Sequence, residues 1–497
     1  MQRQAASPSQ GSNHPTLITD QIAIFDKKAS AEFIAEAFAT NKDSKTARDL
    51  IVQDLKDRQK SGMSAIAEAF VAKPFAAAQT TASYSWLTDC IINTVWQVAN
   101  TYLHPLPNPT EGERLSLIAV GGYGRGEMAP MSDVDLLFLT PYKITPWAES
   151  VIETMLYILW DLRLKVGHAS RTVKDCLRIG SEDYTVQTAM LEHRFICGDG
   201  DLADQFHTTI WSDLFKGNER AFVEAKLDER GKRHEKQGLR YMVEPNVKEG
   251  KGGLRDLQSL FWIAQYVHHT SDPMDLVKLG VFRKDEYDDF VKAREFLWAV
   301  RCHLHLVTNR ATDQLTFDLQ VEVAERMGFK DKSGRRGVEH FMQAYFKHAT
   351  LVGELTRIFL TALENDHTKE APLLQRIFKR RPKIRPGYVV QNNRLNIEDE
   401  ATFLPDPVNI LRIFEEALRT GLFIHPDAMR LIAFNLHLVD NETRTNKEAI
   451  RIFLDLMLKH GNPERALRRM NELGVLSAFT PEFEPIVAMM QFNMYHS

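Results

Sequence analysis

The spacing of apolar and polar residues divides the chain into long helical regions and one shorter region in which strands alternate with helices. Residues 29–103 are predicted to be helical, because Ala-rich stretches there contain few strand-forming residues. Residues 183–365 follow a mainly helical pattern, and helices resume near residue 406 and continue to residue 476. A glycine-bearing loop at 241–258 interrupts the second of these regions. We therefore expect a mostly helical chain.

Strands are predicted between the first two helical regions. Short apolar runs at 115–120, 134–139 and 166–173 predict three strands, and the apolar spacing over 147–164 predicts a helix before the third. A further short strand is predicted at 387–390. An alternating strand–helix unit inside a helical chain makes the expected fold class α+β.

These elements and the breaks between them predict six regions. They are a disordered tail (1–28), an N-terminal helical region (29–103), a strand-containing domain (104–200), a helical domain (201–365), a linker (366–386) and a mainly helical C-terminal region (387–497). The basic run in the linker is more typical of a solvated connection than of a nucleic-acid site.

The composition is that of a folded chain without a strong charge bias. Hydrophobic residues make up 44%, and 62 basic against 66 acidic residues give a formal net charge of −4, which gives no overall signal for nucleic acid. The four cysteines form no Cys-x-x-Cys pair, which fits a reducing compartment and offers no zinc site. His303 and His305 alternate on a predicted helix and face different directions, so they are not expected to bind a metal.

Targeting signals are also missing from the sequence pattern. No apolar run approaches about 18 residues, the length of a membrane-spanning helix. The start of the chain is rich in Gln, Ser and Pro and has no hydrophobic stretch typical of a signal peptide. We expect a cytoplasmic protein with no membrane and no nucleic-acid partner.

Two glycines and two aspartates carry the most chemical information. Gly121 and Gly122 follow the first predicted strand, while Ser132 and Asp133 precede the second, which contains Asp135. Glycines let backbone N–H groups approach phosphate oxygens, and a serine adds a hydroxyl donor. Side chains two residues apart on a strand share a face, so both aspartates are expected to be catalytic and to bind Mg²⁺. The cluster predicts nucleotidyl transfer.

Other phosphate-binding motifs do not fit this segment. A lone diglycine or a lone Asp-x-Asp usually marks a turn, but their combination between apolar runs is more specific. No Gly-Lys-Ser/Thr follows, so it is not a Walker motif, and Glu127 and Ala129 stand where a dinucleotide fingerprint needs glycine. Arg125 could neutralise phosphate charge or could form an ion pair.

The chain resembles a known superfamily at these residues. Gly-Gly-x-Gly-Arg-Gly-Glu at 121–127 and Ser-Asp-Val-Asp-Leu at 132–136 look like the polymerase-β-type nucleotidyltransferases. Segments 167–172, 244–258 and 487–496 narrow the resemblance to the bacterial PII uridylyltransferases, bifunctional enzymes of nitrogen sensing. The resemblance implies a polymerase-β-like nucleotidyltransferase domain flanked by mainly helical domains.

The activity that the resemblance implies is transfer of UMP from UTP to a tyrosine hydroxyl of the signalling protein PII, with pyrophosphate as the leaving group. Asp133 and Asp135 would bind Mg²⁺, which also helps to deprotonate the tyrosine. Gly121, Gly122 and Ser132 would hold the triphosphate.

The glycine-bearing loop is a second candidate part of the site. Lys248, Lys251 and Arg255 could bind nucleotide phosphate or the protein substrate. Gly252 and Gly253 could instead simply permit a sharp turn before the next helix. The resemblance places this loop in the transferase region, which favours a role in the site.

A third carboxylate, which the superfamily often uses, is not evident. The segment 166–172 contains none, and Asp161 and Asp183, the available candidates, are more readily explained by structural roles. Arg171, on the third predicted strand, could contact the triphosphate or form a salt bridge.

The chain stops at Ser497, where the family's HD phosphohydrolase domain begins. We therefore expect the uridylyl-removing and glutamine-sensing parts to be missing from a truncated chain. Two alternatives stay open: a nucleotidyltransferase with another nucleotide or acceptor, and a non-catalytic PII-binding fragment.

Overall fold

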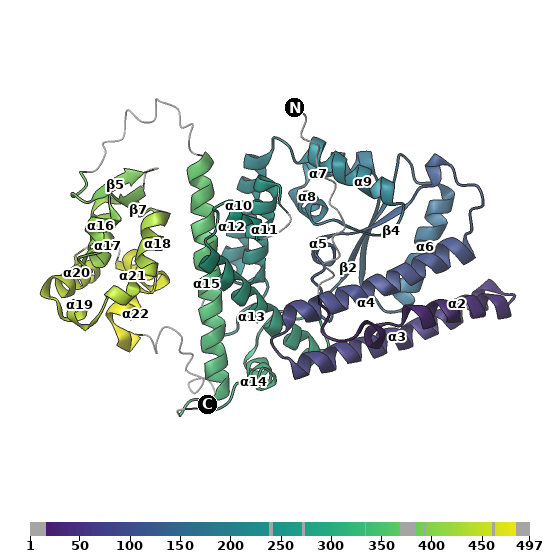
Figure 1. Cartoon of the computed structure of the whole chain (residues 1–497), viewed down its shortest axis with the longest axis horizontal. Helices are drawn as coiled ribbons and strands as arrows, with labels where there is room; N and C mark the ends of the chain where they lie inside the picture. Colours follow the sequence, from purple (N-terminus) through teal and green to yellow (C-terminus); the bar gives the residue numbers. More distant parts are fainter. Residues whose placement is uncertain are drawn as a thin grey trace.

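Helices dominate the structure, and two small sheets lie in different parts of the chain. The computed structural model describes residues 16–237, 242–270, 274–332, 334–367, 383–391, 394–459 and 463–483 (Figure 1). This architecture confirms the predicted α+β fold class, with a strand-containing domain among helical parts. The beginning of the predicted tail, most of the predicted linker and the HD-like segment at 487–496 lie outside the described residues.

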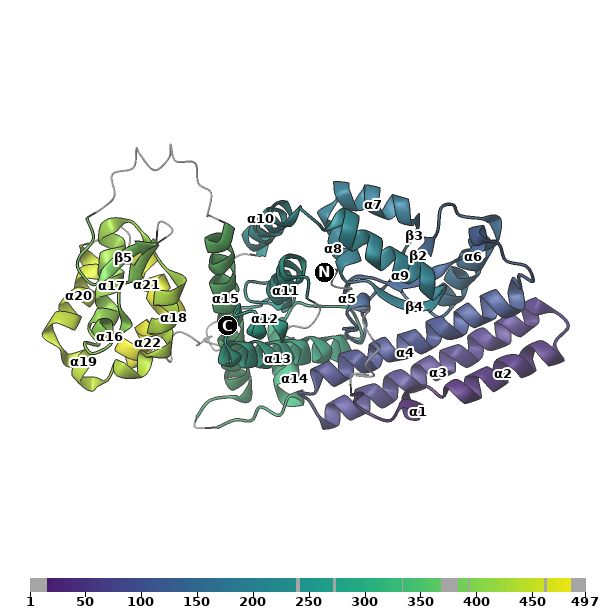
Figure 2. The ribbon, with the colours of Figure 1, turned by 45° about the horizontal axis from the view of Figure 1, so that its top comes forward.

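The N-terminal helices pack side by side beneath the first sheet (Figure 2). They are α1 (Gln21–Ile24), α2 (Lys27–Thr40), α3 (Ser44–Ala72) and α4 (Ala77–Gln97), which a π-helical turn (Val98–Leu103) extends. Asp26 and Asp43 cap α2 and α3 by accepting hydrogen bonds from backbone N–H groups of the first turn. The predicted disordered tail, 1–28, is too long, because Ile24 and Phe25 are buried in the core.

The first sheet has the strand order β3-β2-β1-β4. Its strands are β1 (Ser116–Ala119), β2 (Val134–Thr140), β3 (Val166–Thr172) and β4 (Arg194–Gly198). β1 is antiparallel to β2 and β4, whereas β2 and β3 are parallel and connected through α6 (Pro146–Asp161). β4 was not predicted, because this short edge strand alternates only weakly between buried and exposed positions and depends on pairing with β1.

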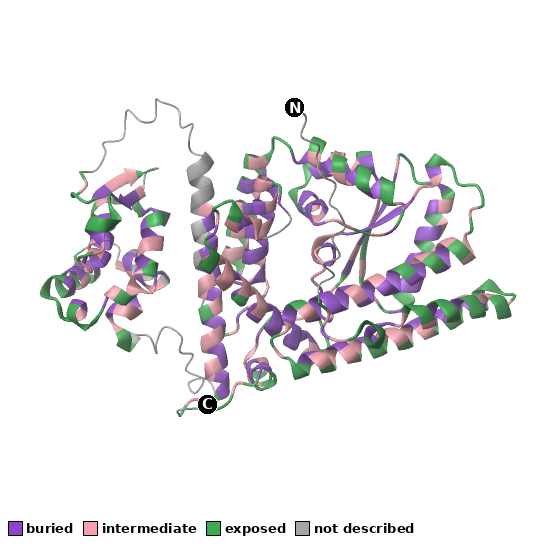
Figure 3. Ribbon diagram, in the orientation of Figure 1, coloured by how far each residue is buried: buried purple, intermediate pink, exposed green. Residues whose placement is uncertain are grey.

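Helices cover both faces of this sheet. On one face, Leu117 and Phe138 belong to a core shared with α4 and α6. On the other, Ile118 and Leu137 pack with α7 (Val173–Glu182), α8 (Tyr184–Leu191) and α9 (Gly200–Thr209). Figure 3 shows the buried residues concentrated along the strands and on the helix faces that turn toward them. Every residue of β2 except Asp135 is buried, so this aspartate interrupts the apolar strand.

A second group of helices follows the sheet. It comprises α10 (Glu219–Gln237), α11 (Leu254–His268), α12 (Asp275–Lys278), α13 (Lys284–Thr308), α14 (Phe317–Arg326) and α15 (Gly337–His367). α15 packs against α11, α13 and α14 and borders this group on the side away from the sheet (Figure 1). The long loop before α11 pairs with the segment after α13 through the bridge between Asn246 and Gln314.

The C-terminal part has its own core around a three-stranded sheet. The strands are β5 (Tyr388–Gln391), β6 (Arg394–Ile397) and β7 (Phe423–Ile424). The helices are α16 (Glu400–Phe403), α17 (Asn409–Thr420), α18 (Pro426–Phe434), α19 (Asn441–Thr445), α20 (Lys447–Leu458), α21 (Pro463–Glu472) and α22 (Val475–Phe479). Of these strands only β5 was predicted, at 387–390, whereas helices were predicted from about 406 to 476. Among the described residues, no helix combines the length and the apolar character needed to span a bilayer.

Candidate active site

The end of β1 and the start of β2 open into a cavity of about 540 Å³. The antiparallel register pairs Ala119 with Leu136, so the residues just after β1 lie beside those at the start of β2. Gly121, Gly122, Ser132, Asp133 and Asp135 all line this cavity. The structure therefore brings together the five residues on which the sequence interpretation depends.

The carboxylate of Asp135 lies between two glycines. Gly121 has a φ of +60°, and a Cβ built on it would lie 3.4 Å from Oδ2 of Asp135. Gly167 is the register partner of Asp135 on β3, and a Cβ there would collide with Oδ1. The two glycines thus leave the space in which this carboxylate lies.

The two aspartates repel each other electrostatically. Burial raises the pKa of Asp135, and the negative charge of Asp133 raises it further, while the Lys248 ammonium opposes both effects. Burial and the neighbouring charge of Asp133 both disfavour an ionised Asp135, and a cation bound by the two carboxylates would offset this cost. Oxygen ligands of this kind are those that Mg²⁺ prefers, so the residues present fit a divalent cation.

No third carboxylate joins this pair from the predicted positions. Asp161 accepts from Nη2 of Arg48 at 2.5 Å, and Asp183 caps α8 by accepting from the Thr185 N–H group at 2.6 Å. Neither lines the cavity. Within the part of the chain that is described, no three His, Cys, Asp or Glu side chains form a metal-binding cluster.

Arg125 lies in the cavity wall and is already paired. Its Nε donates to Glu127 at 2.9 Å and its Nη1 donates to Glu192 at 2.5 Å. The indole N–H of Trp262, on α11, also donates to Glu192. Of the two roles considered for Arg125, the structure shows the ion pair, which here joins the short helix α5 (Gly121–Gly124) to α11 through Glu192.

Ser132 and Arg171 differ in their relation to the cavity. Oγ of Ser132 accepts from the Ala129 N–H group at 3.0 Å, and its own hydrogen can still be donated. Arg171 pairs with Leu139 on β2, four residues beyond Gly167, which corresponds to about 13 Å along the strand. It is not part of the cavity lining, so the structure does not bring Arg171 to the other residues.

The predicted substrate loop divides into two parts. Lys248 and Arg255 line the cavity, whereas Lys251, Gly252 and Gly253 do not. Gly252 has a φ of +78°, and a Cβ there would collide with a backbone carbonyl of α15. Gly253 is the N-cap residue of α11. These two glycines therefore form the sharp turn before α11, which was one of the two alternatives from the sequence. Lys248 and Arg255 lie where a ligand could reach them.

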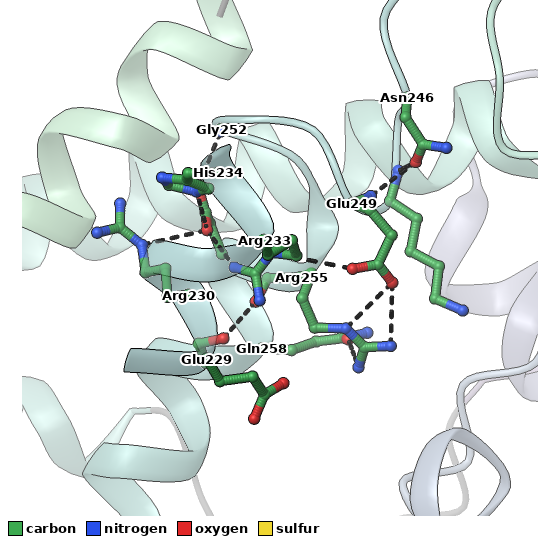
Figure 4. A network of polar contacts seen from close by, with 12 residues as sticks. Glu229, Arg230, Arg233, His234, Asn246, Glu249, Gly252, Arg255 and Gln258 are labelled. Atoms are coloured by element: carbon green, nitrogen blue, oxygen red, sulfur yellow. Dashed lines mark hydrogen bonds and ion pairs between the residues drawn. The ribbon is translucent and has the colours of Figure 1, made fainter. Parts of the chain in front are cut away.

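Asp256 anchors this loop to α10. Its carboxylate is fully buried and accepts from Arg230 (3.2 Å), Arg233 (2.6 Å) and His234 (2.9 Å), and from the backbone N–H group of Gly252 (2.9 Å). Figure 4 shows Arg230, Arg233 and His234 converging beside the loop. Burial alone would raise the pKa of Asp256, but the hydrogen bond from His234 and the neighbouring charges outweigh burial and hold it well below its usual range.

Cationic side chains from three helices complete the cavity wall. Lys226 of α10, Arg255 of α11 and Arg301 of α13 line it together with Lys248. Lys226 and Arg255 lie 5.2 and 5.3 Å from the ring centroid of Trp262. Burial lowers the pKa of Lys248, and the charges of Arg301 and Arg255 lower it further. Positive charges this close together are typical of a site for a polyanion.

Comparisons with known proteins identify the family. The family profile described as GlnD PII-uridylyltransferase matches residues 221–360, and the profile for the uridylyltransferase GlnD third domain matches 388–479. The chain is 65% identical over 474 residues to a bifunctional uridylyltransferase/uridylyl-removing enzyme of Ruegeria pomeroyi. The chain belongs to the GlnD PII-uridylyltransferase family.

Other GlnD relatives give the same result. Proteins with the same name from Cereibacter sphaeroides and Novosphingobium aromaticivorans are 58% and 44% identical over 494 and 481 residues. The three alignments include 95%, 99% and 96% of this chain and 52%, 53% and 52% of the relatives. The chain thus spans about half the length of the curated relatives that it matches.

The region matched by the GlnD PII-uridylyltransferase profile contributes a distinct part of the cavity. Lys226, Lys248, Arg255 and Arg301 lie within residues 221–360, whereas the diglycine and both aspartates precede this region. The cavity therefore lies between the first sheet and the helices that the family profile describes.

Sequence reasoning missed several residues of the cavity wall. Lys226 and Arg301 line it but lie on helices in which charged residues are common, and Glu192, which also lines it, directly follows α8. Trp262 and Trp298 are buried, yet both also line the cavity. No local pattern distinguishes such residues, because only the packing of the helices directs them to one place.

Proposed function

We propose that this chain transfers UMP from UTP to a tyrosine hydroxyl of the signalling protein PII and releases pyrophosphate, using Mg²⁺. The observation that carries this proposal is the single cavity that Asp133 and Asp135 line together with cationic side chains of the helical region. Membership of the GlnD family supports UTP and PII as the nucleotide and the acceptor.

In this proposal, the chain binds UTP with groups from both sides of the cavity. Gly121 and Gly122 bring backbone close to the phosphates, and the Ser132 hydroxyl donates a hydrogen bond to a phosphate oxygen. Lys248 and Arg255 neutralise phosphate charge from the opposite wall. The triphosphate is thereby held beside the aspartates.

Asp133 and Asp135 would hold the cation. When bound, Mg²⁺ neutralises charge on the transferring phosphoryl group and lowers the pKa of the attacking hydroxyl. The backbone of Asp135 is held between β1 and β3, through the hydrogen bond from the Val120 N–H group to its carbonyl and the pairing with Gly167. Arg125 keeps its ion pairs with Glu127 and Glu192 and gives the wall a fixed shape.

The test uses the purified chain, PII and radiolabelled UTP. Asp133→Asn combined with Asp135→Asn should abolish magnesium-dependent labelling of PII and pyrophosphate release while the circular dichroism spectrum stays unchanged. Asp161→Asn, which changes a carboxylate that pairs with Arg48 outside the cavity, is the matched control and should keep its activity. Undiminished turnover in the double variant would refute the assignment.

The same experiment separates the two alternatives. Labelling from ATP, or labelling of a small-molecule hydroxyl, would identify a nucleotidyltransferase with different substrates. Binding of PII without magnesium-dependent modification would identify a binding fragment.

A further inference from the structure

His305, on α13, contacts the loop that carries Asp133. The imidazole is fully buried, and its Nδ1 lies 3.2 Å from the backbone nitrogen of Met131, 174 residues away in the sequence. Met131 is two residues before Asp133. This contact therefore joins the helical region to the backbone that leads into the aspartate pair.

The partners of the ring define its protonation. The Met131 N–H group is a donor, so Nδ1 must be the unprotonated acceptor and Nε2 carries the hydrogen. Nε2 faces Oδ1 of Asp313 at 3.4 Å, and the same oxygen accepts from Nε of Arg301 at 2.7 Å. Asp313 and Arg301 thus orient His305 toward the loop.

Electrostatics favour this neutral form. Burial lowers the pKa of His305, and although Asp313 opposes the effect, Arg301 and Lys248 add to it. Burial would raise the pKa of Asp313, but the hydrogen bond from His305 and the charge of Arg301 hold it well below its usual range. The ring stays neutral and Asp313 stays ionised.

The loop needs such an anchor because Asp133 itself is exposed and lies outside the strand. The loop closes on itself through the Ala129–Ser132 turn, in which the Ser132 N–H group donates to the Ala129 carbonyl at 3.0 Å. On the other side, the Val134 N–H group donates to the Lys165 carbonyl at 2.8 Å. The contact of Met131 with His305 ties this turn to a rigid helix.

We propose that His305 is a positioning residue, which fixes the backbone at Met131 so that the Asp133 carboxylate stays beside that of Asp135 in the cavity. The consequence for activity rests on the proposed function, whereas the anchoring of the loop and the cation affinity do not. Residues that orient metal ligands typically contribute 10–100-fold to metal affinity or activity. His305 acts through Met131 and touches neither carboxylate in this role.

Two substitutions separate anchoring from packing. In His305→Asn, the amide oxygen takes the place of Nδ1 and can still accept from Met131. In His305→Gln, the amide nitrogen takes the place of Nε2 and can donate to Asp313, but no acceptor faces Met131. Both replace the ring by a smaller amide, so loss of packing should affect them similarly.

The first measurement is hydrogen exchange of the peptide spanning residues 128–134, together with Mn²⁺ binding followed by electron paramagnetic resonance. His305→Gln should lose protection in this peptide and bind Mn²⁺ about 10-fold or more weakly, whereas His305→Asn should retain most of both. In the PII assay, His305→Gln should lower kcat more than it raises KM for UTP. Equal effects of the two substitutions would overturn the proposal.

The wild-type chain provides a measurement that needs no variant. Nitrogen NMR with labelled histidine should find Nε2 of His305 protonated and Nδ1 unprotonated, and a proton on Nδ1 would overturn the proposal even if His305→Gln does not fold. If the wild type shows the expected exchange and Mn²⁺ binding but labels no PII, the proposed function fails while the positioning role holds.

Discussion

Gly167→Ala tests the position of Asp135 without changing either aspartate. A Cβ at this position would lie about 1 Å inside the ordinary van der Waals distance from Oδ1 of Asp135, and a displacement of about 1 Å near reacting groups can cost about 10²-fold in rate. The atom that must move is the end of a side chain rather than backbone, and Gly167 has no left-handed φ. We therefore expect kcat for UMP transfer to fall by about 10²-fold while the midpoint of thermal unfolding stays nearly unchanged.

The assay compares steady-state labelling of PII by Gly167→Ala and by a control glycine variant. Gly200→Ala is the matched control, since a Cβ there meets nothing within 4 Å, and it should label PII at the wild-type rate. Wild-type kcat in Gly167→Ala would refute the reasoning that Asp135 must lie against this glycine for the reaction. A fall in kcat with an equal loss of folded protein would also contradict it.

Three further predictions concern stability. Asp256→Asn should destabilise the chain by about 3–5 kcal/mol in urea unfolding, because the fully buried carboxylate holds two arginines and a histidine that lose their anion; a loss below about 1 kcal/mol would contradict this. Gly252→Ala should lower the thermal midpoint, because a Cβ would collide with the Ala349 backbone at a left-handed φ, whereas Gly200→Ala should not; equal midpoints would refute this. Burial lowers the pKa of His193 and His303 to about 4, so their neutral forms stabilise the fold above pH 6.5, and this contribution is lost as the pH falls toward 4. The free energy of unfolding should therefore drop by about 2 kcal/mol per histidine between pH 7.5 and 5, and His303→Gln should reduce this pH dependence.

Local sequence determined much of the fold. The apolar runs correctly predicted β1, β2, β3 and β5, and the helical spacing predicted the helices on both sides of the first sheet. These elements follow from side chains close together in the sequence, because a helix or a fully buried strand needs a periodic or continuous apolar pattern. Short strands such as β4, at an edge of the first sheet, and β6, in the middle of the second, lack that pattern and form only where a partner strand is present.

The candidate site also consists of residues that local sequence predicts and residues that only tertiary packing adds. Gly121, Gly122, Ser132, Asp133 and Asp135 lie within 15 residues, and the antiparallel pairing of two adjacent strands is enough to bring them together. The sequence by itself therefore determined this half of the cavity and the chemistry that it predicts. The sequence left the role of Arg171 open, because only the register of β3 decides how far along the strand this residue lies.

Tertiary structure alone decided the other half of the cavity. Lys226, Trp262, Arg301 and His305 come from three helices, and their distances in the sequence carry no information about which of them meet. Helix packing directs these faces toward the start of β2, because apolar burial over the whole helical region fixes the orientation of each helix. The sequence thus determined which residues could hold a cation, and the packed fold determined which charges surround it and what holds the loop in place.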